Sequence, residues 1–185
     1  MMGIISQFND TLHNWFLNQG IDVDFVEGED FCFYTEHNTV QYGLLDDPDA
    51  DNNFEQFAYE YGIKYTCHPF VLSLLHEVGH KQTLFTCFTE EERKTDRVAK
   101  NNYTGTRSIE TNYWYWELPT EFAANMWAIN WVNTHIDELR DLHNLCSEWL
   151  DKIYDDANIS QQIMDWKDEI METKEYKPLI INEEE

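Results

Sequence analysis

His76-Glu77-Val78-Gly79-His80 is the most informative stretch of this 185-residue chain. On a helix, residues four positions apart share one face, so His76 and His80 can hold one metal ion between them. Glu77 then lies beside the first of these histidines, where its carboxylate can take a proton from an attacking water molecule. The alternative is a helix that carries two histidines by chance. The flanking residues have to decide between this interpretation and a metal site.

The residues around this stretch predict a buried helix over 67–82. Pro69 suits the first turn of a helix. Apolar side chains cover most of its surface: Phe70, Val71, Leu72, Leu74, Leu75 and Val78. Burying two histidines and a glutamate in such a helix is costly unless something pairs with them. A metal ion would do so, and the flanking residues therefore favour a metal site.

A catalytic zinc ion needs a third protein ligand, and the best candidate lies in a second apolar helix that begins at Pro119. Glu121 and Asn125 are four residues apart and share one face of that helix. Glu121 would complete a set of two His and one Glu, and Asn125 would accept the free ring N–H of a ligand histidine. The alternative is a glutamate favoured by the helix dipole, with Asn125 in solvent.

The two segments together resemble the Glu-zincin (gluzincin) peptidases, and most of all the small ImmA/IrrE type. The matching residues are His76, Glu77, Gly79 and His80, followed by Glu121, Ala124, Asn125, Trp127 and Ala128. The resemblance implies that the two histidines and Glu121 bind zinc and that Glu77 is the general base. It also implies an intracellular protease that cuts a regulatory protein, often a DNA-binding repressor, and that holds the substrate backbone along a strand edge beside the active helix.

Composition favours one folded domain. Hydrophobic residues make up 42% and aromatic residues 15% of the chain, which is too much for an acidic disordered protein. No apolar run is long enough to span a membrane, and the first residues do not resemble a secretory signal. Four widely spaced cysteines (Cys32, Cys67, Cys87 and Cys146) match no CxxC pattern, so reduced thiols in the cytoplasm are the simplest interpretation.

The formal net charge is −24, from 36 acidic and 12 basic residues. Such a charge disfavours direct binding to nucleic acid or to a membrane surface and attracts basic partners. Solubility explains it most simply. The alternatives are a protein substrate with a basic segment, such as a DNA-binding regulator, and mimicry of a nucleic acid backbone.

The residues before the active helix predict a helix, a small sheet and a second helix. Apolar residues repeat at helical spacing over 4–16. Strands expected over 21–25, 31–36 and 40–44 would form an antiparallel meander. The acidic stretch 46–53 is expected to be a solvated loop, and a short helix over 54–61 can end at Gly62.

Residues 83–117 form an insertion between the two helices with candidate ligands. Thr89 and Glu92 resemble a capping box, which predicts a helix as far as about Lys100. Five basic residues lie in the insertion: Arg93, Lys94, Arg97, Lys100 and Arg107. They either pair with acidic residues of the same chain or belong to a lid near the cleft.

The insertion ends in Tyr113-Trp114-Tyr115-Trp116, which is expected to be a buried aromatic strand. Alternatively, Tyr113 or Tyr115 reaches the zinc and stabilises the oxyanion that forms during peptide attack. Beyond the second ligand helix, apolar spacing predicts further helices over 136–153 and 159–171.

The sequence therefore predicts a single α+β, zincin-like domain with a small antiparallel sheet, an HExxH helix and a helical C-terminal half. Its parts are the N-terminal helix and sheet (1–66), the active-site helix (67–82), the insertion (83–117) and a helical part with the third ligand (118–177). The expected activity is zinc-dependent cleavage of an intracellular regulatory protein. The alternative is a non-enzymatic acidic protein that binds a basic or DNA-binding partner. Its zinc site would then be structural or vestigial. Glu77 favours the enzyme, because a structural site needs no base.

Overall fold

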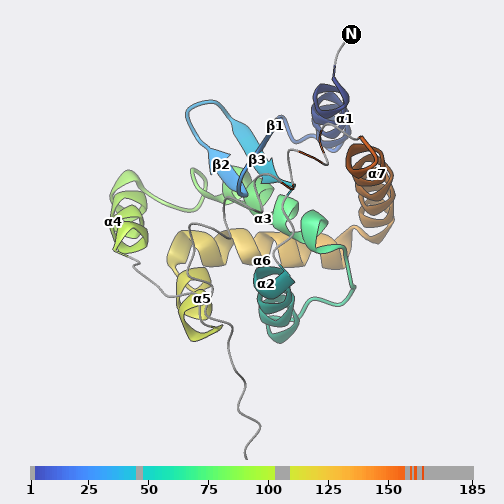
Figure 1. Ribbon diagram of the computed structural model, residues 1–185. Coiled ribbons are helices and arrows are strands. Elements are labelled where there is room, and N and C mark those ends of the chain that lie inside the picture. The colour runs from blue at the N-terminus through green and yellow to red at the C-terminus, as the bar shows by residue number, and fades with distance from the viewer. Residues whose placement is uncertain are drawn as a thin grey trace, which may run out of the picture.

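A computed structural model describes residues 3–44, 48–102 and 109–156, together with the isolated positions 159, 161 and 164. This part of the chain contains seven helices and three strands and is α+β, as predicted (Figure 1). The elements are α1 (Ile4–Asn18), β1 (Asp24–Gly28), β2 (Cys32–Tyr34), β3 (Thr39–Gly43), α2 (Pro48–Glu60), α3 (Pro69–Thr83), α4 (Glu90–Asn101), α5 (Ile109–Trp116), α6 (Pro119–Thr134) and α7 (Ile136–Tyr154). None of these helices has the length and apolar character that crossing a membrane requires.

The three strands form a mixed sheet in the order β1-β3-β2. β3 pairs in parallel with β1 and antiparallel with β2, so that Val40 lies between Phe25 and Phe33. The predicted antiparallel meander is therefore wrong, and β1 starts later than the predicted 21–25. Alternating apolar residues fix which face of a strand is buried but not the order of the strands. β3 takes the centre because it brings two fully buried side chains, Val40 and Tyr42.

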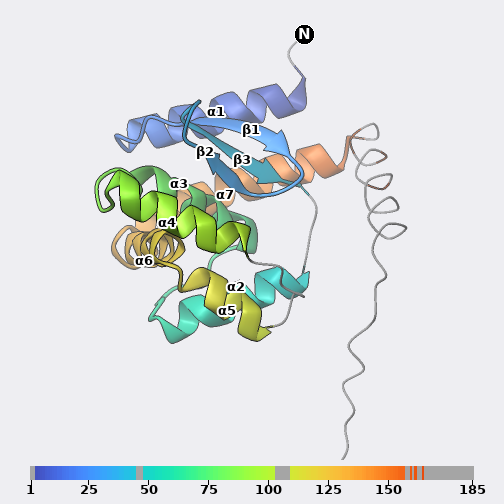
Figure 2. The ribbon, with the colours of Figure 1, turned by 90° about the vertical axis from the view of Figure 1, so that its left-hand side faces the viewer.

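Helices cover the apolar face of this sheet. α1 packs against β1, and α3 packs against β2 and β3 (Figure 2). Phe8 of α1 is fully buried and its ring centroid lies 5.4 Å from that of Tyr42 and 6.2 Å from that of Phe70 in α3. Aromatic packing of this kind fixes α3 relative to the sheet, so the helix that carries the HExxH residues has a rigid support.

α3 and α6 pack along each other at the centre of the helical part (Figure 1). Both begin with a proline in the first turn, Pro69 and Pro119, as predicted. Their backbones come close at Gly79, where a Cβ atom would lie only 2.5 Å from the carbonyl oxygen of Ala124. Gly79 therefore permits the close approach that brings the first turn of α6 next to the histidines of α3.

Two predicted elements are wrong. Residues 48–53 form the beginning of α2 and not a loop, and Pro48 suits a helix start. Tyr113–Trp116 end α5 and do not form a strand. Tyr113 and Trp116, three residues apart, lie on one helix face, and both ring centroids are 5.4 Å from that of Phe57.

The other helix predictions agree with the structure. Thr89 and Glu92 form the predicted capping box at the start of α4, and α7 spans the apolar repeat predicted over 136–153. The predicted helix over 159–171 falls outside the described residues, apart from three isolated positions.

Candidate metal centre

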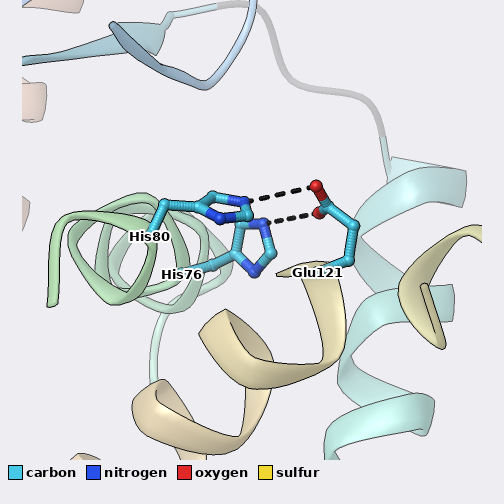
Figure 3. Close-up of side chains that lie close together, drawn as sticks. All are labelled: His76, His80 and Glu121. Atoms are coloured by element: carbon cyan, nitrogen blue, oxygen red, sulfur yellow. Dashed lines mark ion pairs between the residues drawn. The ribbon is translucent and has the colours of Figure 1, made fainter. Parts of the chain in front are cut away.

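Three side chains from α3 and α6 converge on one point. His76, His80 and Glu121 each offer a ligand atom, and these atoms all lie within 4.8 Å of one another. Nε2 of His76 is 3.2 Å from Oε2 of Glu121, and Nε2 of His80 is 3.3 Å from Oε1 (Figure 3). All three residues are buried. The structure thus brings together the predicted ligand set in a cluster that can hold a metal ion, and zinc as its occupant stays a prediction.

The local sequence explains this geometry. The four-residue spacing of the histidines puts both rings on one face of α3. Glu121 lies in the first turn of α6, and the contact of Gly79 with Ala124 brings that turn against α3. The donors therefore come from two rigid helices and from no loop, which limits their freedom before any metal binds.

Asn125 orients one of the histidines, as its spacing from Glu121 predicts. Its Oδ1 lies 2.7 Å from Nδ1 of His76, and its amide nitrogen donates to the carbonyl oxygen of Trp116 at 3.2 Å. Because Oδ1 can only accept, Nδ1 of His76 carries the proton. In the neutral ring this leaves the lone pair on Nε2, the nitrogen that faces Glu121.

The electrostatics of the cluster suit a cation. Burial favours the neutral form of His76, but the hydrogen bond to Glu121 and the charges of Glu77 and Glu121 outweigh it and raise its pKa. Burial disfavours the Glu121 carboxylate, but hydrogen bonds from both histidines hold its pKa well below the usual range. Without a metal ion, the raised pKa of His76 favours a proton on its ring, which balances the carboxylate. A metal ion bound to the same nitrogens and oxygens would replace that proton.

Glu77 lies next to these donors. It is 6% exposed, and its Oε1 is 3.7 Å from Nε2 of His76. Burial raises its pKa. A carboxylate with a raised pKa is a stronger base than one in water, which is the direction that proton abstraction near neutral pH requires.

The two candidate oxyanion-stabilising tyrosines lie in different surroundings. Tyr115 lines the cleft in front of the cluster. Burial, with the charges of Glu121 and Glu77, raises the pKa of Tyr115, so it keeps a proton to donate. Tyr113 packs against Phe57 and Trp116 and does not belong to the cleft lining.

A second polar cluster, which the sequence analysis missed, lies beside the first. Lys100 of α4 contacts Oε1 of Glu121 and lies 2.7 Å from the Thr120 hydroxyl and 3.3 Å from Oδ2 of Asp96. Asp96 is buried and accepts hydrogen bonds from the backbone N–H and the hydroxyl of Thr120. It therefore caps the start of α6, where Leu118 offers no acceptor of its own. The four-residue spacing of Asp96 and Lys100 predicts that these two side chains pair on α4. It does not predict that they contact α6.

Both clusters open onto one cleft of about 940 Å³. β2 contributes Cys32 and Phe33 to the lining, α3 contributes the HExxH residues, and α4 contributes several basic residues. A volume of this size is at the upper end of the range for small-molecule pockets and admits several residues of an extended peptide.

No protein-family model, curated protein or solved structure matches this chain. The resemblance to the gluzincins therefore depends on the motif residues alone and stays a hypothesis.

Proposed function

We propose that this chain is a zinc-dependent peptidase of the gluzincin type, with the metal held by His76, His80 and Glu121. The observation that carries the proposal is the buried cluster of these three donors, which lines a wide cleft with Glu77 directly beside it. A structural zinc site usually has four protein ligands and needs no base. Within the described residues only three donors cluster, and a base accompanies them.

The residues present fit a hydrolytic reaction. Zinc, when bound, would supply Lewis-acid chemistry by lowering the pKa of a water molecule and polarising the scissile carbonyl. Glu77 takes the proton from the water oxygen as that oxygen attacks the carbonyl carbon, and then delivers it to the amide nitrogen as the C–N bond breaks. Tyr115 donates a hydrogen bond to the developing oxyanion. Asn125 keeps Nε2 of His76 directed at the site.

The proposed substrate is an intracellular regulatory protein, with a DNA-binding repressor as the type that the resemblance implies. Among the described strands β2 lies at the edge of the sheet and lines the cleft, and this edge is the proposed binding place for the substrate backbone. A non-enzymatic acidic protein that binds a basic or DNA-binding partner is the second candidate, and the net charge of −24 is the observation that favours it.

Glu77→Gln separates the two candidates, because the amide keeps the size of the side chain and removes the base. We expect this variant to keep its metal and to lose hydrolysis of a degenerate peptide mixture by about 10²- to 10⁴-fold, measured as new amino termini. Glu148→Gln, an exposed change on α7, is the control and should retain activity. Hydrolysis by Glu77→Gln at the wild-type rate, or a metal-loaded wild type without hydrolysis, would favour the binding protein.

A further inference from the structure

One wall of the cleft, formed by α4, carries four cations together with Glu90 and the buried Asp96. Arg93, Lys94, Arg97 and Lys100 all line the cleft, which is four of the 12 basic residues in the chain. Lys94, Arg97 and Lys100 are spaced three apart, so they form a continuous ridge along α4. This ridge ends at the metal centre, because Lys100 contacts Glu121.

Two of these cations have partners in the described part of the chain, and two have none there. Arg93 donates to the carbonyl oxygen of Phe88 at 2.6 Å and lies over the ring of Phe85. Lys100 is bound by Asp96, Thr120 and Glu121. Lys94 and Arg97 are exposed, and neither forms an ion pair within the described residues. Like charges one turn apart repel each other on a helix, and a bound anion would relieve that repulsion.

The rest of the molecule makes this arrangement selective. With a formal net charge of −24, the protein repels acidic ligands at long range, and within the cleft an acidic segment gains attraction where it meets the α4 ridge. Glu29 and Asp30, from the turn between β1 and β2, also line the cleft. All four cations of the lining come from α4, so an extended peptide in the cleft meets these cations along that helix.

We propose that the cleft binds a peptide segment with an acidic side chain directed at α4, where Lys94 and Arg97 recognise its carboxylate. This substrate class rests on the proposed function, since it concerns the same cleft and metal centre. An acidic substrate differs from the basic substrate that net charge alone predicts. The reason is that the ligand meets the local cations of α4 and not the average charge of the surface.

The test uses pools of ten-residue peptides in which one position is fixed as Glu, Gln or Lys and the others are degenerate. Mass spectrometry places each fixed position relative to the cleaved bond. The wild type should cleave Glu pools about two- to fivefold faster than Gln pools at one or two positions, the effect of one exposed ion pair. Arg97→Glu should invert this preference in favour of Lys at those positions.

Arg140→Glu is the matched control, because Arg140 is exposed on α7, outside the cleft lining, and its replacement changes the net charge equally. It should leave the preference unchanged. An equal response to Arg97→Glu and Arg140→Glu, or a wild type without preference for Glu at any position, would overturn the inference.

A binding measurement keeps this inference separate from the peptidase proposal. The same pools are passed over immobilised Glu77→Gln protein, and the retained peptides are counted. Retention of Glu pools that depends on Arg97, without hydrolysis by the wild type, would support the inference and refute the peptidase. Equal retention of Glu, Gln and Lys pools would refute the inference whatever the wild type cleaves.

Discussion

Glu121 connects the two polar clusters of the cleft. One carboxylate oxygen faces His76, and the other faces both His80 and Lys100. With 3% of its surface exposed, the residue has little access to water that could replace these partners. Removing the carboxylate would leave buried donors without an acceptor, which costs more than losing an exposed interaction.

We therefore predict that Glu121→Ala abolishes metal binding. Glu117→Ala is the control, because Glu117 is exposed and accepts a hydrogen bond from Tyr61 at 2.8 Å, outside the metal centre. Elemental analysis of both purified variants measures the outcome. If Glu117→Ala lost the metal and Glu121→Ala kept it, the third ligand would be assigned wrongly.

Asn125→Ala tests the orientation of His76. Without the amide, the Nδ1–H of His76 loses its acceptor, and the ring can turn away from the site. Metal affinity should fall by roughly ten- to a hundredfold, the usual effect of removing the partner of a ligand histidine. Competition with a chromophoric chelator measures the affinity. An unchanged dissociation constant would mean that packing alone fixes the ring.

Short-range geometry explains which residues of the site could be predicted. The spacing of His76 and His80, and of Glu121 and Asn125, follows from the helix repeat. Lys100 could not be predicted, because its contact with Glu121 depends on how α4 packs against α6. Tyr113 and Tyr115 could not be distinguished either, since a strand and a helix orient neighbouring side chains differently.

At the scale of secondary-structure elements, the contact between α3 and α6 determines the geometry of the candidate metal centre. Gly79 lets the two backbones approach, and the first turn of α6 then lies against the histidines. The support of α3 by the sheet and by α1 keeps this arrangement rigid. Any change that separates the two helices should loosen all three donors together.

Gly79→Ala should separate these helices. Alanine favours a helix over glycine by about 1 kcal/mol, but its Cβ would meet the Ala124 backbone, which cannot move aside like a side chain. We expect a net loss of about 1–3 kcal/mol in the free energy of unfolding, measured in urea, and weaker metal binding. Gln82→Ala on the same helix, where no such clash exists, is the control. A Gly79→Ala protein as stable as the wild type would show that α3 and α6 tolerate a larger separation.

The elements themselves were predicted where local signals are strong. Proline at the first turn, the capping box at Thr89 and helical apolar spacing each act within a few residues, and α1, α3, α4, α6 and α7 were all predicted. The strand order, the start of α2 and the helical form of Tyr113–Trp116 were not. The strand order and the helical form of Tyr113–Trp116 depend on packing partners far away in the sequence, such as Phe57 for the aromatic residues of α5. The start of α2 was missed although Pro48 is a local helix-start signal.

At the scale of the whole molecule, a metal ion bound at the His76–His80–Glu121 cluster would be coupled to folding. The donors come from two separate helices, so the unfolded chain does not present them together. A ligand that binds only the folded state stabilises it by about 2.7 kcal/mol at a hundredfold excess over its dissociation constant. The thermal stability of the protein should therefore report on the occupancy of the metal centre.

We predict that zinc raises the melting temperature of the wild type and not that of Glu121→Ala. The increase should diminish as the pH falls through the raised pKa of His76, because a protonated imidazole cannot bind metal. Without metal the sign is opposite: a raised folded-state pKa means that protonated His76 stabilises the fold below the pKa of an unfolded histidine, and this contribution disappears as the pH rises through the raised value. A zinc effect that is equal in both proteins, or independent of pH, would place the metal elsewhere.

The metal content of the wild-type protein, purified without added metal, tests the central claim most directly. Elemental analysis should find about one equivalent of zinc per chain, since the two histidines and Glu121 form a single site. Less than about a tenth of an equivalent of any transition metal, with none taken up on titration, would contradict the account.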